Sequence, residues 1–409
     1  MSFYLAGHDN FGNRGCEALV RSIAGLVRTQ LPQARFSVPS VAPALDAPQW
    51  PEMGLDGAAL VAPSRMPGSI KWWNRAVSRV PALLSMWEPR YSLPAALQAT
   101  IDGSSAVVMT GGDVISLDYA FGDLFRWSGF IDAAARSGCP TMLFAASVGP
   151  FSAHPVVERH MQNHLKRYSI ITVRESASLQ YLRRLGLEQA VLVADPAFCL
   201  VPEAVEPGAP YTDPGDGVLA FNVSPLVARG WQRQNPGLSL IEECAAFIRR
   251  VLAQTGLSVA LLPHVDPLDG ASENSDSAYM TDLLTALGGP QRRLALVRRG
   301  LNAAQIKYLV GRSRYLIAAR THATVAGWSQ HVPTVSIAYS IKARGLNQDL
   351  FDSLDHVLDT PKVDRDTLWA SYERLASREA DIRSLLQERI PQWRAKAAHS
   401  AELLAGIAR

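Results

Sequence analysis

Short apolar runs alternate with amphipathic stretches along this chain, and this alternation constrains its fold more than any other feature. Each run has the length of a buried strand, and each following stretch has the 3.6-residue period of a helix. Such βαβ repetition predicts a parallel sheet with helices on both faces. In the first half the expected strands are 3–6, 106–109, 141–145, 170–173 and 191–194, and the expected helices are 17–30, 124–137, 156–166 and 176–185.

The pattern stops at a stretch rich in Pro, Gly and acidic residues, 202–217, and then begins again. The second half predicts strands 218–222, 259–263, 294–297, 315–319 and 334–338, and helices 238–256, 277–288, 303–311 and 323–331. We therefore predict an α/β protein with two doubly wound, Rossmann-like domains that face a cleft. The expected parts are an N-terminal domain 1–200, a linker 201–217, a C-terminal domain 218–362 and a helical tail 363–409.

Size and charge narrow the class of protein. A chain of 409 residues exceeds the ~250–300 residues at which single cores stop growing, so two domains are expected. The net charge of +3 is small for this length, which argues against a nucleic-acid partner. No apolar run reaches the ~20 residues needed to span a bilayer, which predicts a cytoplasmic protein. The four cysteines are widely scattered, and we expect neither a metal nor a cofactor.

Residues 65–97 interrupt the pattern with aromatic and basic side chains, namely Trp72, Trp73, Trp87, Tyr91, Lys71, Arg75, Arg79 and Arg90. Amphipathic aromatics beside cations suit a lid, or a surface that meets a sugar or lipid-linked acceptor and associates peripherally with a membrane. The alternative, which we prefer, is an excursion packed against the first domain.

In doubly wound folds ligands bind at the carboxyl ends of strands, so polar residues there are candidate site residues. The first strand leads into a glycine-rich loop that opens a helix. Its backbone N–H groups at Gly12, Asn13 and Gly15 are suited to an anion, with Asp9 and Asn10 beside them. A tight turn capped by Asn10 or Asn13 explains the same pattern.

Two further strands of the first half end in charged residues. Gly111 and Gly112 precede Asp113, which suits a base or the cap of a following helix. Arg174 follows a strand and suits a carboxylate or phosphate ligand, but it could instead form a structural ion pair with Glu175.

The second half places His264 after one strand and Arg320 with His322 after another. A cation two residues from a titratable imidazole suits an anionic site in which protons move, although a capped turn is an equal alternative. Lys342 and Arg344 follow the next strand and add cations at the same edge.

Taken in order, these segments resemble the polysaccharide pyruvyl transferase family over roughly residues 1–350. The matching pieces are Asn10-Phe11-Gly12-Asn13-Arg14-Gly15-Cys16-Glu17-Ala18-Leu19, Thr110-Gly111-Gly112-Asp113, Ser147-Val148-Gly149-Pro150, Val173-Arg174-Glu175-Ser176, Ala194-Asp195-Pro196-Ala197-Phe198, Arg320-Thr321-His322-Ala323 and Val332-Pro333-Thr334-Val335 with Tyr339 and Lys342. Where many relatives have Gly-Asp, a third Gly and Leu, this chain has Gly15-Cys16, Thr110 and Thr321.

The resemblance implies an arrangement like that of type B glycosyltransferases and transfer of pyruvate from phosphoenolpyruvate, as co-substrate, onto two hydroxyls of a glycan. The glycan would belong to a cell-surface polysaccharide or exopolysaccharide, or to its precursor. The resemblance assigns Arg320 and His322 to the donor, with Arg174 as a second arginine.

Chemistry adds further candidates to this assignment. Phosphoenolpyruvate carries a phosphate and a carboxylate, so we add Lys342 and the Gly12, Asn13 and Gly15 loop to the donor site. His322 is the first candidate for acid/base catalysis, with Asp113 or His264 as its counterpart, and Asp9, Asn10 and Gly112 are candidates for acceptor binding. A nucleotide-sugar glycosyltransferase of the same architecture is the rival hypothesis, and a non-enzymatic anion- or sugar-binding module is a third.

Overall fold

The computed structural model describes residues 1–80, 82–86, 89, 91–117, 121–339 and 341–408. Trp87 and Arg90, named above in the aromatic and basic segment, lie outside the described residues. The chain divides into two compact units. The first comprises Met1–Asn10, Leu19–Pro196 and Ala395–Arg409, and the second comprises Phe11–Ala18 and Ala197–Arg394.

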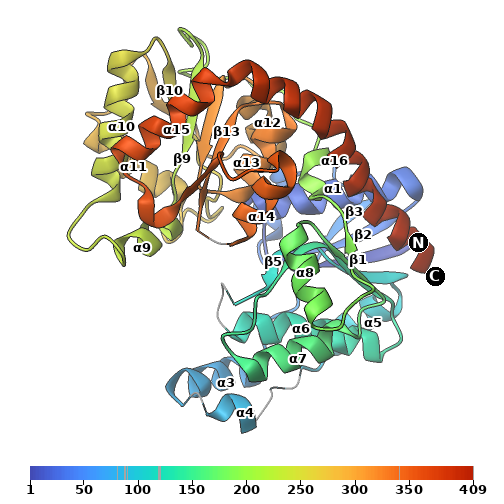
Figure 1. The fold of residues 1–409 in the computed structure, drawn as a ribbon. Coiled ribbons are helices and arrows are strands. Elements are labelled where there is room, and N and C mark those ends of the chain that lie inside the picture. The colour runs from blue at the N-terminus through green and yellow to red at the C-terminus, as the bar shows by residue number, and fades with distance from the viewer. Residues whose placement is uncertain (81, 87–88, 90, 118–120, 340, 409) are drawn as a thin grey trace. The chain divides into compact units, whose positions relative to one another are not determined.

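The first unit is built on a parallel sheet of eight strands within the described residues (Figure 1). Its strand order is β3-β2-β1-β4-β6-β7-β8, and β5 pairs with β6. The strands are β1 (Ser2–Ala6), β2 (Arg35–Pro39), β3 (Ala58–Val61), β4 (Ala106–Met109), β5 (Gly112–Ile115), β6 (Thr141–Val148), β7 (Ile170–Val173) and β8 (Val191–Leu192). The helices are α1 (Arg14–Gln30), of which only the part from Leu19 belongs to this unit, α2 (Pro43–Asp46), α3 (Gly68–Arg79), α4 (Leu83–Met86), α5 (Ala95–Asp102), α6 (Phe121–Arg136), α7 (Pro155–Leu165) and α8 (Ser176–Arg184).

The second unit is built on a six-stranded parallel sheet with the order β11-β10-β9-β12-β13-β14 among the residues described. This is the 3-2-1-4-5-6 order of the Rossmann fold. The strands are β9 (Val218–Asn222), β10 (Ser258–Leu261), β11 (Leu294–Leu296), β12 (Tyr315–Ala318), β13 (Thr334–Ala338) and β14 (Val357–Asp359). The helices are α9 (Pro225–Gln232), α10 (Leu240–Gln254), α11 (Asp276–Ala286), α12 (Ala303–Gly311), α13 (Thr321–Ser329), α14 (Ile341–Phe351), α15 (Arg365–Ser377) and α16 (Glu379–Ile407).

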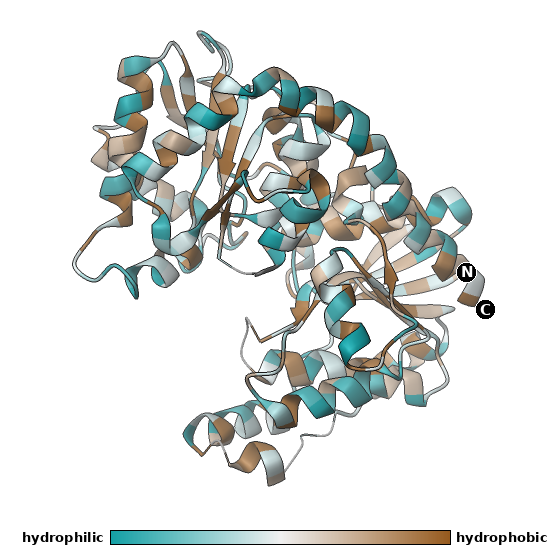
Figure 2. Cartoon of the chain, viewed as in Figure 1, coloured by the Kyte–Doolittle hydropathy of each residue, from teal (hydrophilic) through white to brown (hydrophobic). Residues whose placement is uncertain are grey.

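Burial explains why these segments form strands. Every residue of β4, β9, β10, β12 and β13 is buried, as expected for parallel strands covered by helices on both faces. Figure 2 shows apolar strands in both sheets and helices that carry polar residues. The predicted fold class, two doubly wound α/β units, is therefore confirmed.

The predicted division into 1–200, 201–217, 218–362 and 363–409 differs from the two observed units at two segments. Each of these segments belongs to the unit formed mainly by the other half of the chain. Residues Phe11–Ala18 belong to the second unit, and Ala395–Arg409 belong to the first. The predicted tail forms α15 and α16, and Pro391 lies inside α16. The residues of the predicted anion-binding loop therefore belong with the second sheet.

The aromatic and basic segment has both a buried and an exposed side. Ile70, Trp73 and Val77 of α3 are buried, at positions that share one helix face. The Trp73 ring lies 4.6 Å from that of Phe125 on α6, centroid to centroid. Trp72 is 61% exposed. Within the described part of the segment α3 thus packs on the first unit, as in the alternative that we prefer, and its Trp72 side chain is exposed to solvent.

Candidate functional site

The candidate site of the second unit lies where its strand order changes direction, between β9 and β12. Asn222 is the last residue of β9, and Arg320 follows β12. The Arg320 backbone N–H donates to the Asn222 side-chain oxygen at 3.0 Å. Ligands of Rossmann-like folds bind at such switch points. We call Asn13, Gly15, His264, Arg320 and His322 the second-unit cluster.

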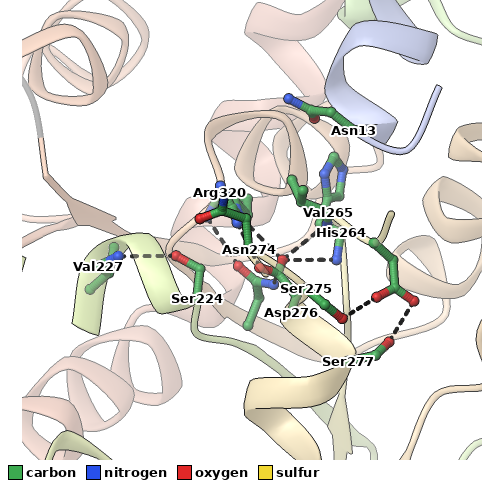
Figure 3. Close-up of polar contacts among 12 residues, drawn as sticks. Asn13, Ser224, Val227, His264, Val265, Asn274, Ser275, Asp276, Ser277 and Arg320 are labelled. Atoms are coloured by element: carbon green, nitrogen blue, oxygen red, sulfur yellow. Dashed lines mark hydrogen bonds and ion pairs between the residues drawn. The ribbon is translucent and has the colours of Figure 1, made fainter. Parts of the chain in front are cut away.

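A buried carboxylate orients Arg320 (Figure 3). Its Nη2 donates to Asp276 Oδ1 at 2.7 Å, and its Nε lies 3.2 Å from both carboxylate oxygens. Asp276 Oδ2 also accepts from the backbone N–H groups of His264 and Val265 at 3.1 and 3.0 Å. Asp276 is fully buried, whereas the Arg320 side chain is 13% exposed. The guanidinium is therefore held in one orientation with part of its surface accessible.

The predicted glycine-rich loop packs against the same strand ends. The Arg14 N–H donates to the His264 carbonyl at 3.1 Å, and the Asp266 N–H donates to the Gly12 carbonyl at 2.8 Å. The Gly15 N–H donates to the Asn13 side-chain oxygen at 2.9 Å. The first two bonds attach the loop to the segment that follows β10, and the third lies within the loop.

The close approach of the His322 ring leaves no room for a side chain at position 15, which is a glycine. A β-carbon placed at Gly15 would lie 2.9 Å from His322 Cγ, and closer still to Nδ1. The imidazole ring therefore packs directly on the backbone of Gly15. This contact places the first residues of α1 beside the first residues of α13.

The beginning of α13 differs from those of its neighbours. Helices α9, α10, α11, α12 and α15 each begin with a side chain that accepts from their first N–H groups. The N-cap residue of α13 is Arg320, whose side chain makes no such bond. N–H groups at such a helix start, together with the helix dipole, favour an anion. The second-unit cluster therefore combines a fixed arginine, two imidazoles and a helix N-terminus.

His264 is 4% exposed and lies among positive charges. Burial is the largest cause that holds its pKa well below the ordinary value, and the charges of His322, Arg320 and Arg14 lower this pKa further. The imidazole is thus neutral near pH 7.

Arg174 lies in the first unit, within a buried polar network. Its Nη1 donates to Asp195 Oδ2 at 2.6 Å, and its Nε donates to Ser147 Oγ at 2.9 Å. Glu175 Oε2 is 3.7 Å from Nε. Burial lowers the pKa of Arg174, but the charges of Asp195, Glu175 and Asp113 outweigh burial and raise it. Arg174 therefore forms the ion pairs of the structural alternative, and its role toward the donor stays a prediction.

Asp113 is the second residue of β5, so the alternative that it caps a helix is wrong: the next helix, α6, begins at Phe121. Gly111 and Gly112 both have positive φ, +71° and +68°. A β-carbon at Gly111 would collide with the backbone of Phe144 and Ala145. These glycines allow the backbone before Asp113 to pass close to β6. From this position the charge of the Asp113 carboxylate raises the pKa of Arg174.

The remaining predicted residues occupy different places. Asp9 pairs with Arg126 of α6, and Asn10 is exposed. Lys342 is 4% exposed near the start of α14. Arg344 pairs with Asp359.

The sequence reasoning missed Asp276, which anchors Arg320, and Arg14, which lowers the pKa of His264. An aspartate that follows a serine at a helix start resembles an ordinary first-turn acid, so no sequence signal distinguishes Asp276. Within the described residues no group of three His, Cys, Asp or Glu side chains could hold a metal ion. None of the described helices is long and apolar enough to cross a membrane.

Solved structures share this fold at low identity. A UDP-N-acetylglucosamine 2-epimerase has a TM-score of 0.60 at 12% identity and covers 99% of this chain and 95% of its own. The Neisseria meningitidis UDP-GlcNAc 2-epimerase bound to UDP-GlcNAc has a TM-score of 0.56 at 10% identity, with 100% and 99% covered. A UDP-glucosyltransferase from Polygonum tinctorium has a TM-score of 0.56 at 13% identity, with 99% and 98% covered. These values establish a fold like that of type B glycosyltransferases.

Sequence comparison is more specific about the family. No curated protein sequence matches the chain at a significant level. The family model for polysaccharide pyruvyl transferase matches residues 13–341, most of the chain, including Arg174 and the whole second-unit cluster. The chain therefore belongs to the polysaccharide pyruvyl transferase family.

Proposed function

We propose that this protein transfers pyruvate from phosphoenolpyruvate onto two hydroxyls of a glycan, forming a cyclic ketal. The glycan belongs to a cell-surface polysaccharide or exopolysaccharide, or is its precursor. The observation that carries the proposal is the second-unit cluster, in which Arg320 and His322 flank the start of α13 and the Gly15 backbone contacts His322. Membership of the family supports the reaction type.

The second-unit cluster suits a donor that carries both a phosphate and a carboxylate. Arg320 supplies a planar set of donors that matches either anion. The backbone N–H groups at the start of α13 supply further donors without the side-chain entropy cost of ordering a lysine, whereas at the start of α1 those of Arg14 and Gly15 already donate to the His264 carbonyl and the Asn13 side chain. Because the charge of Arg320 is offset by Asp276, the N–H groups of α13 and Lys342 matter for the net attraction of the donor.

The reaction needs an acid, a base and a site for the leaving phosphate. Protonation of the methylene carbon leaves C2 electron-poor, and one hydroxyl oxygen bonds to C2 as it loses its proton. Phosphate then departs, taking the C2–O bonding pair, and the second hydroxyl adds with loss of its proton. We assign the acid to His322 and the base to Asp113; His264 can take the base role only in the state in which its imidazole stays neutral with the donor bound. The acceptor hydroxyls are assigned to the first unit, at Asp9, Asn10 and Gly112.

Replacing Arg320 with lysine tests the donor site without leaving Asp276 as an uncompensated buried charge. We expect phosphoenolpyruvate affinity to fall by about 1.5–3 kcal/mol, because an ammonium cannot contact Asp276 and two donor oxygens in the planar geometry of a guanidinium. Titration calorimetry measures the change. Arg365→Lys is the matched control, since Arg365 binds Glu243 through the same two nitrogens, Nε and Nη2. Equal affinity in the Arg320 variant and the control would contradict the assignment.

Donor binding should be accompanied by proton uptake. His264 is neutral in the empty site because its pKa is low, and a bound phosphate and carboxylate would raise that pKa by favouring the imidazolium. Calorimetry in two buffers of different ionisation enthalpy should show net uptake at a pH between the low pKa of the empty site and the raised pKa of the complex, and affinity should rise as the pH falls through this range. Uptake should be lost in His264→Asn. Unchanged proton uptake in His264→Asn would show that a group other than His264 takes up the proton.

The proposed donor is tested by competition. Phosphoenolpyruvate should bind, and UDP should not displace it. The Neisseria epimerase of similar fold is bound to UDP-GlcNAc, which makes UDP the informative competitor. Tight UDP binding without binding of phosphoenolpyruvate would favour a nucleotide-sugar glycosyltransferase instead.

A further inference from the structure

A cavity opens in the first unit, and none of its lining residues belongs to the second-unit cluster. It has a volume of about 690 Å³ and is lined by residues that end or follow β1, β2 and β3. These three strands are neighbours in the sheet (Figure 1), so the cavity lies at their carboxyl ends. Its size is within the ~300–1,000 Å³ of small-molecule sites.

Arg126 of α6 is the fixed charge in this cavity. The residue is 6% exposed, and its Nη1 and Nη2 donate to the two Asp9 carboxylate oxygens at 2.8 and 2.5 Å. Nη2 also donates to the Ser64 carbonyl, and the guanidinium lies 4.3 Å from the ring centre of Trp127. Among the described residues of the lining Asp9 is the one acid, and Arg126 offsets its charge.

The uncompensated charge of the cavity is positive. Arg65 and Lys71 also line it, are exposed, and form no ion pair with any carboxylate that the structure describes. The sequence from 57 to 87 contains four basic residues and no acidic residue, so no carboxylate of this stretch neutralises them. An anionic ligand is therefore favoured over a neutral or cationic one.

The remaining wall is apolar and offers few groups to a neutral sugar. Val41, Leu60, Val61, Pro63 and Met66 contribute hydrocarbon surface. The Ser40 hydroxyl already donates to Asp46 at 2.5 Å and accepts from the Ala42 N–H at 3.0 Å. A ligand that fills this space needs an apolar body as well as a charged head.

We infer that this cavity binds a phosphate or carboxylate group joined to an apolar body, with Arg65 and Lys71 as its direct cations and Arg126 as the charge beneath them. The proposal of an anion site rests only on the residues of the first unit that line this cavity. Its identification as the place where the glycan acceptor holds its charged or lipid-linked end rests on the proposed function.

Four small probes separate the charge of the ligand from its apolar body. Octyl phosphate and octanoate carry the two anions on one chain length, octyl glucoside carries a neutral sugar on the same chain, and inorganic phosphate carries the anion alone. We expect octyl phosphate or octanoate to bind at least about tenfold more tightly than octyl glucoside and inorganic phosphate, and the stronger of the two identifies the anion. Equal or tighter binding of octyl glucoside would overturn the proposal.

Charge reversal locates the binding. Both cations are exposed, so Arg65→Glu with Lys71→Glu should leave the fold intact and weaken binding of the tighter anionic probe at least about tenfold. The matched control is Arg75→Glu with Arg79→Glu, two exposed cations of α3 that do not line the cavity, and it should change binding less than about threefold. Equal losses in both variants would assign binding to general surface charge and overturn the site.

The same double variant separates this site from the donor site. Phosphoenolpyruvate binding should be unchanged in Arg65→Glu with Lys71→Glu, because the second-unit cluster is untouched. A protein that binds the anionic octyl probe but not phosphoenolpyruvate would keep the cavity and refute the proposed function. A protein that binds phosphoenolpyruvate but none of the octyl probes would refute the cavity proposal and leave the proposed function standing.

Discussion

His322→Gln should lower turnover by ~10²–10⁴-fold while leaving phosphoenolpyruvate binding nearly intact, which is the usual size of general acid–base catalysis. Glutamine retains a hydrogen-bond donor and similar length but cannot exchange a proton at neutral pH. His322 is the second residue of α13, where its ring packs on Gly15. The change therefore removes the proton-transfer group without removing Arg320 or the N–H groups of the helix start.

Steady-state rates and calorimetric donor affinities, measured on the same preparations, separate these effects. His399→Gln, at an exposed position of α16, is the control and should behave as the unmodified protein. Normal turnover in His322→Gln would limit His322 to positioning the donor. The proton transfer would then be assigned to His264 or Asp113.

Trp73→Ala should destabilise the protein by about 3–5 kcal/mol, the usual cost of deleting a large buried aromatic side chain. Trp73 is fully buried against Phe125, and Trp72, its neighbour in sequence, is 61% exposed. Trp72→Ala should therefore change stability by less than about 0.5 kcal/mol. Trp72→Ala is therefore the matched control for Trp73→Ala.

Denaturant unfolding of the two variants measures this difference. Because α3 carries Lys71, loss of Trp73 should also weaken the rim of the cavity in the first unit. Similar stabilities for the two variants would show that α3 is not anchored to the core through Trp73.

The sequence predicted strands best where they are buried on both faces. β4, β7, β9 and β13 begin and end where the apolar runs do, because parallel strands under two helical layers have no polar side to interrupt the run. β2, β3, β5 and β14 were missed. The sequence of β2 begins with Arg35 and ends with Pro39, and β3 is partly exposed and begins with two alanines, so neither has a strong strand signal.

The sequence predicted which residues form the candidate site better than it predicted how these residues are held in place. The glycine-rich loop, His264, Arg320 and His322 were each found from their place after a strand, and the structure brings them together in one unit. Their supporting groups were not found, because Asp276 is 54 residues from Asn222 and 44 from Arg320, and such pairings depend on tertiary structure. The exchange of Phe11–Ala18 into the second unit has the same cause.

The fate of the labelled C2 carbon of phosphoenolpyruvate tests the central claim most directly. The protein is incubated with phosphoenolpyruvate labelled with ¹³C at C2 and with a panel of cell-surface glycans and lipid-linked precursors, and the products are followed by carbon and phosphorus magnetic resonance. We predict that the label moves into a ketal carbon bonded to two glycan oxygens, with one phosphate released for each ketal formed. Label recovered only as phosphoenolpyruvate or free pyruvate, with every glycan in the panel unmodified, would contradict the account.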